Sequence, residues 1–300
     1  MIAFIFPGQG SQYVGMAKSF VEIPQGKEML EKADDILHVD LSRTMLEGPE
    51  DKLRQTEYTQ PALFLHSAIA LAYGGETQTP AAYAGHSLGE FTALYAAGAF
   101  SFEDAISLVH LRGKLMAEAG RRSEGTMAAI IGMEPKKLYE LCEEVETETG
   151  AIVRPANFNS PGQIVVSGSV KGVQELIARA KASGVRMAKE LTVSGAFHSP
   201  LMQYAADGLR EALDSSAIFA PKIPVFANVT AEPHGSPDSI RELLVRQLTS
   251  PVRWEETVKN MYDFGVREFV EFGAGKVLQG LIGRTVNDVA VRGVEHAPKD

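Results

Sequence analysis

Three polar side chains interrupt a run of small and apolar residues, and one of them, Ser87, could act as a nucleophile. In AAYAGHSLGEFTALYAAGAF, residues 81–100, His86, Ser87 and Glu90 lie within five positions, and two glycines bracket the serine. A segment that only filled a core would not carry three polar groups so close together. Residues 85–89, Gly-His-Ser-Leu-Gly, fit the G-x-S-x-G pattern of a nucleophile elbow, in which a strand enters, the chain turns sharply and a helix leaves.

Such an elbow would expose the Ser87 hydroxyl at the tip of the turn and place the Leu88 N–H at the start of the following helix. The positive end of that helix dipole would then face any oxyanion that forms. The same pattern is also compatible with a plain helix N-cap, in which Ser87 only accepts backbone N–H bonds. A strand expected before the turn and a helix expected after it favour the nucleophile.

A serine nucleophile needs a base, and the chain has 7 histidines. His86 is a poor candidate, because neighbouring side chains at a turn usually diverge from Ser87. His198 lies in the loop VSGAFHSP and follows the elbow in chain order, as the histidine does in serine hydrolases. A single histidine is more often a structural residue, so only this context favours His198.

The elements that must position these groups alternate between apolar strands and helices. IAFIF (residues 2–6) and residues 81–84 read as buried strands of a parallel sheet. Helices are expected over residues 60–74, 88–97 and 102–120, and PVFANVT and REFVEFG read as further strands. We therefore expect a large α/β domain formed by residues 1–123 and 197–300.

The pattern changes in the middle of the chain. GTMAAIIGM, QIVVSGS and VRMAKELTV read as strands, AIVRPANFN is a fourth candidate, and two amphipathic helices lie between them. That βαββαβ-like alternation is the size of a small ferredoxin-like domain. We expect it to occupy residues 124–196 as an insertion in the larger domain.

Composition limits the classes of partner and compartment. The net charge is −9 and the pI about 5.4, which argues against nonspecific binding to nucleic acid or to an anionic membrane. Cys142 is the only cysteine, so no internal disulfide is expected. The N-terminus lacks the basic region of a signal peptide, and no stretch approaches the roughly 20 apolar residues of a membrane span. A cytoplasmic protein is the expectation.

Eight stretches in the same order resemble one family. They are FPGQGSQ (6–12), TQPALF (59–64), GHSLGE (85–90), LVHLRGKLM (108–116), GTMAAIIG (125–132), FHSP (197–200), QLTSPVRW (247–254) and EFGAGKVLQGL (271–281). Together they resemble the malonyl-CoA:acyl carrier protein transacylases of fatty-acid synthesis, which have relatives in polyketide synthases. The resemblance implies a large domain similar to the α/β-hydrolases, a ferredoxin-like insertion, and an active site between the two.

The resemblance also implies a role for five residues of the reaction centre. Ser87 would be the acylated nucleophile and His198 its base. The backbone N–H groups of Gln9 and Leu88 would bind the oxyanion. The main-chain carbonyl of Gln247 would orient His198 in place of the aspartate of a hydrolase triad. A phosphate-binding loop at PGQGSQ is disfavoured, because no Lys-Ser/Thr follows it at the spacing that such a loop requires.

Substrate-binding residues follow from the same resemblance. Arg112 would bind the malonyl carboxylate with two charge-assisted hydrogen bonds; considered alone, an arginine on an amphipathic helix reads as a surface charge. Phe197 resembles the residue of malonyl-selective members and would crowd an α-methyl group. Met127 reads as a pocket wall or core, and Asn157 and Asn159 as pocket-lining or turn-forming residues.

The implied reaction transfers malonyl from malonyl-CoA to acyl carrier protein without a metal or redox cofactor. Carrier proteins are acidic, so docking would need a local basic patch. The candidates, which also read as ordinary solvated charges, are Arg186, Lys189, Lys276 and Arg284. Two alternatives remain open from the residues: a serine thioesterase or hydrolase acting on acyl-CoA, and a module that binds carrier protein without catalysis.

Overall fold

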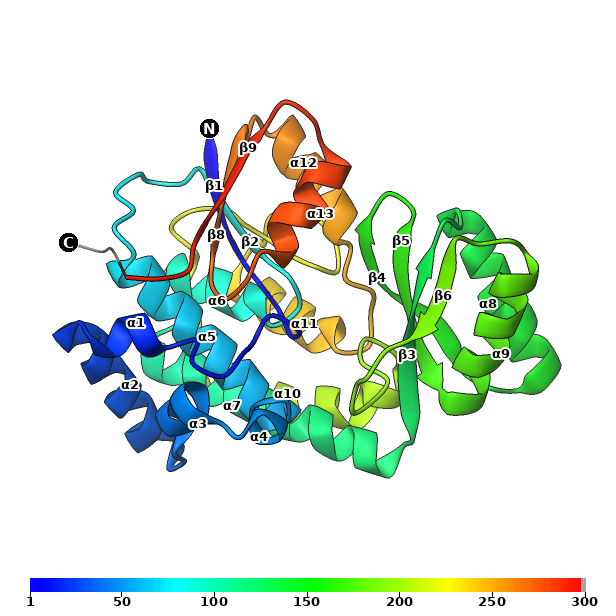
Figure 1. Ribbon diagram of the computed structural model, residues 1–300, viewed down its shortest axis with the longest axis horizontal. Helices are drawn as coiled ribbons and strands as arrows, with labels where there is room; N and C mark the ends of the chain where they lie inside the picture. Colours follow the sequence, from blue (N-terminus) through cyan, green and yellow to red (C-terminus); the bar gives the residue numbers. More distant parts are fainter. Residues whose placement is uncertain (298–300) are drawn as a thin grey trace.

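The chain combines a parallel sheet with a separate antiparallel sheet, as the mixed strand and helix pattern predicts (Figure 1). The computed structural model describes residues 1–297. Neighbouring strands of the first sheet all run parallel. In spatial order they are β7 (Val225–Phe226), β2 (Ala82–Gly85), β1 (Ile2–Phe6), β8 (Glu268–Phe272) and β9 (Ala290–Val294).

The central strands of the parallel sheet are apolar on both faces because helices cover both sides. Phe4 and Phe6 of β1 belong to one buried cluster, together with residues of the long helices. Ala3 and Ile5 of the same strand point the other way, into a cluster that includes Trp254. The period of two along a strand therefore divides IAFIF between two cores.

Helices surround this sheet, and their expected positions agree with the structure. The expected helices correspond to α5 (Thr56–Tyr73), α6 (Gly89–Ala96) and α7 (Phe102–Arg122). The others are α1 (Lys18–Val21), α2 (Pro24–Leu37), α3 (Leu41–Glu47), α4 (Glu50–Leu53), α10 (Gln203–Asp214), α11 (Pro237–Gln247), α12 (Trp254–Asp263) and α13 (Val277–Thr285), with a 3₁₀ turn at Pro200–Met202.

The middle of the chain builds the antiparallel sheet, which stands beside the parallel one in Figure 1. Its elements in chain order are β3 (Gly125–Ile131), α8 (Pro135–Thr149), β4 (Val153–Ser160), β5 (Gln163–Ser169), α9 (Val170–Ala182) and β6 (Met187–Glu190). The strand order is β4-β5-β3-β6. A buried cluster of its own, including Ile130, Leu138 and Val173, holds the helices on this sheet.

Two expected strands are shorter in the structure, and one further strand has no counterpart among those expected. Strand β6 ends at Glu190, because the chain leaves the sheet after Leu191 donates its N–H to Met127 O at 2.9 Å. Strand β7 has two residues, because Ala227 turns back and bonds to Glu232 O at 2.9 Å. Strand β9 was not anticipated at all; it is an edge strand that pairs only with β8, and its burial is correspondingly incomplete.

Candidate active site

Ser87 sits at a sharp turn between β2 and α6, and this turn depends on two glycines. Ser87 has φ of 51°, a left-handed conformation that side chains rarely adopt. A Cβ on Gly85 would lie 1.9 Å from the Gly89 backbone, and a Cβ on Gly89 would lie 2.1 Å from Phe6 O. The chain therefore needs glycine at both positions to bring the turn against β1, which is the geometry of a nucleophile elbow.

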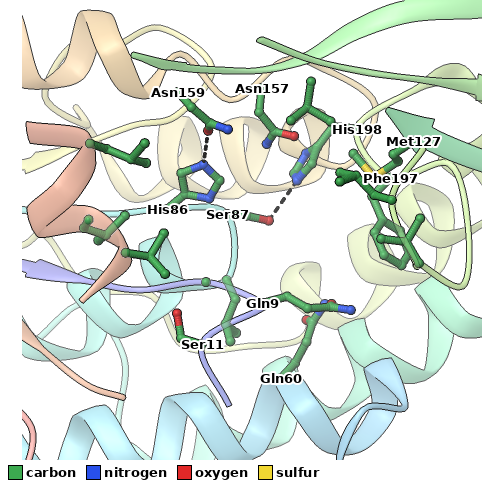
Figure 2. A pocket seen from close by; sticks show the side chains of 18 of the residues that line it. Gln9, Ser11, Gln60, His86, Ser87, Met127, Asn157, Asn159, Phe197 and His198 are labelled. Carbon is green, nitrogen blue, oxygen red and sulfur yellow. Dashed lines mark hydrogen bonds between the residues drawn. The ribbon is translucent and has the colours of Figure 1, made fainter. Parts of the chain in front are cut away.

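His198 meets Ser87 although 111 residues separate them in sequence. Its Nε2 lies 2.8 Å from Ser87 Oγ (Figure 2), and its Nδ1 lies 2.7 Å from the Gln247 carbonyl oxygen. Since a carbonyl can only accept, Nδ1 carries the proton and Nε2 is free to receive one from the serine. His86 does not compete for this place, because its Nε2 lies 2.9 Å from Asn159 Oδ1.

The imidazole of His198 is held in its neutral form. Burial is the main cause, and the neighbouring Arg112 guanidinium adds to it; together they lower the pKa of His198 to about 3. A ring that stays neutral near pH 7 can act as a base without first losing a proton.

Arg112 is not a surface charge: its side chain is 0% exposed and points from α7 to the nucleophile. Its Nη2 donates to Ser87 Oγ at 3.1 Å and to Gln247 Oε1 at 2.8 Å, and its Nη1 donates to Gln60 Oε1 at 2.7 Å. Burial lowers the pKa of Arg112 to about 10, and the charge of Glu90 opposes that fall. The guanidinium therefore remains a cation at neutral pH, directly beside the serine.

A cavity of about 240 Å³ opens over Ser87, between the two sheets. Gln9, from the loop after β1, and Leu88, at the start of α6, line it next to the serine, as Figure 2 shows for Gln9. Residues from the antiparallel unit and the segments that follow it supply the opposite wall. Of the residues expected there, the cavity is lined by Met127, Asn157, Asn159, Phe197 and His198.

The two asparagines are not turn residues. Asn157 and Asn159 both belong to strand β4, and the Oδ1 of Asn159 reaches across to His86 on the other unit. Met127 is 5% exposed on strand β3, so it is both a wall of the cavity and part of a buried cluster.

Four polar residues of the site carry no role in the sequence analysis. Gln60, Glu90, Asn228 and His234 are all buried. Asn228 accepts from the Ser87 N–H at 2.7 Å and donates to Gly85 O at 2.7 Å, so it holds the elbow from both sides. The available signal was a polar residue near the carboxyl end of the apolar segment PVFANVT, because polar groups at that edge of a parallel sheet gather at one site.

The four expected docking residues are exposed and lie on two different parts of the molecule. Arg186 and Lys189 lie at β6 of the antiparallel sheet, and Lys276 and Arg284 lie at α13. Arg284 Nη1 donates to Gln163 Oε1 at 2.6 Å, so this side chain bridges the two units. Among residues 1–297, no helix is long and apolar enough to cross a membrane.

Comparison with known proteins places this geometry in a family. The model of the acyl transferase domain matches residues 3–298. The chain belongs to the acyl transferase family. A malonyl CoA-acyl carrier protein transacylase of Bacillus subtilis (strain 168) is 45% identical over 295 residues, which cover 97% of this chain and 93% of that protein. The family resemblance drawn from the eight motifs is therefore confirmed.

Solved acyl transferases share the whole fold. The malonyl CoA-acyl carrier protein transacylase of Coxiella burnetii superposes with a TM-score of 0.95 at 39% identity, covering 98% of this chain and 94% of that one. A malonyl-transacylase solved in complex with a type II polyketide synthase acyl-carrier protein has a TM-score of 0.94 at 41% identity, with coverage of 99% and 96%.

Proposed function

We propose that this chain transfers a malonyl group from malonyl-CoA to the phosphopantetheine thiol of acyl carrier protein, through an ester on Ser87. The single observation that carries the proposal is that Ser87 Oγ lies 2.8 Å from the His198 base and 3.1 Å from the Arg112 cation. An acyl group attached to this oxygen would hold its third carbon close to the guanidinium. A malonyl group carries a carboxylate at that carbon, and a guanidinium binds a carboxylate with parallel hydrogen bonds.

In the first half-reaction, Ser87 Oγ attacks the thioester carbonyl while His198 Nε2 takes the hydroxyl proton. The N–H groups of Gln9 and Leu88 would stabilise the oxyanion, and each such donor typically contributes about 3 kcal/mol. The carbon–sulfur bond then breaks, and the sulfur leaves as CoA thiol with the proton from His198. Malonyl-serine remains.

In the second half-reaction, the thiol of the carrier protein gives its proton to His198 and attacks the ester carbonyl. The carbon–oxygen bond breaks, and Ser87 recovers the proton from His198. The Gln247 carbonyl keeps the imidazole in the required tautomer throughout. This chemistry needs no metal or redox cofactor, since every step is a proton transfer or an acyl transfer.

Selectivity would come from two side chains. Arg112 would exchange its bond to Ser87 for bonds to the malonyl carboxylate as the ester forms. Phe197 lines the cavity beside the serine and would crowd the α-methyl of methylmalonyl. One methyl group in an apolar pocket is worth about 1–3 kcal/mol, so this second selection would be partial.

We infer that the two sheets belong to two domains, one similar to the α/β-hydrolases and one ferredoxin-like. A strand–elbow–helix turn in a parallel sheet supports a domain similar to the α/β-hydrolases for residues 1–123 and 197–300. The element order βαββαβ, with all neighbouring strands antiparallel, supports a ferredoxin-like domain for residues 124–196.

The carrier protein would approach the cavity mouth between these domains, guided by Arg186, Lys189, Lys276 and Arg284. The relative crystallised with an acyl-carrier protein supports a partner of this class. A cytoplasmic reaction fits the single cysteine, Cys142, which is buried and unpaired.

Intact-mass measurement of the protein tests the proposal and its alternative. With malonyl-CoA alone, the wild type should gain a stable malonyl adduct, which should pass to holo-acyl carrier protein when that is added. Ser87→Ala should gain none, while the control Ser11→Ala, which changes the other serine of the cavity, should keep it. Steady release of CoA without carrier protein would instead identify a thioesterase, and an adduct on Ser87→Ala would refute the nucleophile.

A further inference from the structure

Behind the serine and the arginine lies a carboxylate that the proposed chemistry does not use. Glu90 is 0% exposed on the first turn of α6. Its Oε2 accepts from Gln247 Nε2 at 2.7 Å and from the Asn228 N–H at 3.0 Å, and its Oε1 lies 2.8 Å from His234 Nε2. Both carboxylate oxygens are therefore occupied by donors inside the protein.

Gln247 links this carboxylate to the arginine. The side-chain amide of Gln247 turns its Nε2 to Glu90 and its Oε1 to Arg112 Nη2, at 2.7 and 2.8 Å. A single amide thus separates a buried anion from a buried cation. The opposite orientation of the amide would place its oxygen against the Glu90 carboxylate and the Ser87 carbonyl, which can only accept hydrogen bonds.

Glu90 supplies the charge that the direct partners of Arg112 lack. The three oxygens that accept from the guanidinium belong to neutral groups: the amides of Gln60 and Gln247 and the hydroxyl of Ser87. A buried cation without compensation is costly. His234 Nε2 lies 2.8 Å from Glu90 Oε1, and its Nδ1 is buried without a partner among the described residues.

We propose that Glu90 is a positioning residue: its carboxylate is the counter-charge that holds Arg112 in the empty site. The same carboxylate lowers the affinity of Arg112 for the malonyl carboxylate. This inference rests on the proposed function. In the empty enzyme, one buried anion balances one buried cation. When malonyl binds, its carboxylate and that of Glu90 share one cation, Arg112. The two anions repel each other, so malonyl binds less tightly and the product is released more readily.

The test measures binding of two ligands in the Ser87→Ala background, where no ester forms. Calorimetry with malonyl-CoA and with acetyl-CoA, which lacks the carboxylate, compares Glu90 with Glu90→Gln. The introduced amide keeps the size of the side chain: its oxygen can accept from Gln247 and Asn228, and its NH2 can donate to His234 Nε2 when the neutral ring carries its proton on Nδ1, so the charge and one ring tautomer change. We expect Glu90→Gln to lower the Kd for malonyl-CoA by about 5- to 30-fold and to leave that for acetyl-CoA within about 2-fold.

In otherwise wild-type protein, the same change should lower KM for malonyl-CoA and also lower kcat, because product is held more tightly. The matched control is Glu271→Gln. Glu271 is also 0% exposed, but it accepts from the Leu278 and Gln279 N–H groups at the start of α13. This control should leave the ratio of the two Kd values unchanged.

Each outcome decides a separate point. If Glu90→Gln weakens the binding of both ligands equally, or leaves the Kd for malonyl-CoA unchanged, Glu90 only supports the scaffold and the inference is wrong. If the parent protein shows no preference for malonyl-CoA over acetyl-CoA, the proposed function fails instead.

A double variant tests the proposal in the case that Glu90→Gln does not fold. Glu90→Gln with Arg112→Met removes both charges and should restore a cooperative thermal unfolding transition. A double variant that also fails to fold would overturn the counter-charge role.

Discussion

The rate at which Ser87 is modified should not depend on pH across the range in which an ordinary histidine titrates. Burial and the Arg112 guanidinium lower the pKa of His198 to about 3, whereas an unperturbed imidazole has a pKa of about 6.5. At pH 5, a ring with the ordinary pKa would be only about 3% neutral, and the rate would fall about 30-fold from its plateau. A ring with a pKa near 3 would still be about 99% neutral.

A neutral fluorophosphonate that reacts with nucleophilic serines is the suitable probe, because it carries no group that titrates in this range. Labelling of Ser87 would be followed by intact mass between pH 4.5 and 8, with circular dichroism to verify that the protein stays folded. The wild type should give a flat profile. Arg112→Met should raise the pKa of His198, but not to the ordinary value, because burial is the larger cause.

A wild-type acid limb centred near pH 6.5 would refute this reasoning, since it would mean that the ring is hydrated and protonates freely. An unchanged profile in Arg112→Met would mean that the pKa of His198 stays below the measured pH range without the guanidinium, so that burial alone keeps the ring neutral there.

Three further predictions concern Arg112, Gly89 and His66, the last a buried residue of α5 whose ring packs edge-on against Phe20. Arg112→Met should lower kcat/KM for malonyl-CoA roughly 30- to 4000-fold, which corresponds to a loss of about 2–5 kcal/mol of transition-state stabilisation. Acetyl transfer should change little, and acylation time courses would measure both rates. Gly89→Ala should destabilise the fold by at least about 1–3 kcal/mol in urea unfolding and slow acylation, because the new Cβ meets Phe6 O at 2.1 Å. Burial lowers the pKa of His66 to about 4, so unfolding takes up a proton as the pH falls below 6.5. When the pH falls from 7.5 to 5, the free energy of unfolding should therefore decrease by about 2 kcal/mol more in the wild type than in His66→Phe. The phenylalanine ring can pack against Phe20 as the imidazole does. Equal decreases in the two proteins would contradict the assigned pKa.

Local signals in the sequence predicted most of the elements near the site. The apolar run IAFIF, the glycines around Ser87 and the amphipathic pattern after Phe102 each act over a few residues, so the strand, the elbow and α7 could be read directly. The exceptions were short or marginal strands. β7 and β9 lie at the two edges of the parallel sheet, where the pairing partner rather than the local sequence decides whether a strand forms.

The residue types of the site were readable from the chain, but their mutual distances were not. Sequence alone determined that a serine lies on a sharp turn, that a histidine follows it in a loop, and that an arginine lies on a helix. Only the tertiary structure decided that Arg112 is buried rather than solvated, and that Gln247 faces His198 with its backbone and Arg112 with its side chain. It also revealed Glu90, Asn228 and His234 as one network. The physical reason is that a buried polar group is stable only with hydrogen-bond partners. The partners Asn228 and His234 lie more than a hundred residues from Glu90 in the chain, and no local pattern encodes their contact.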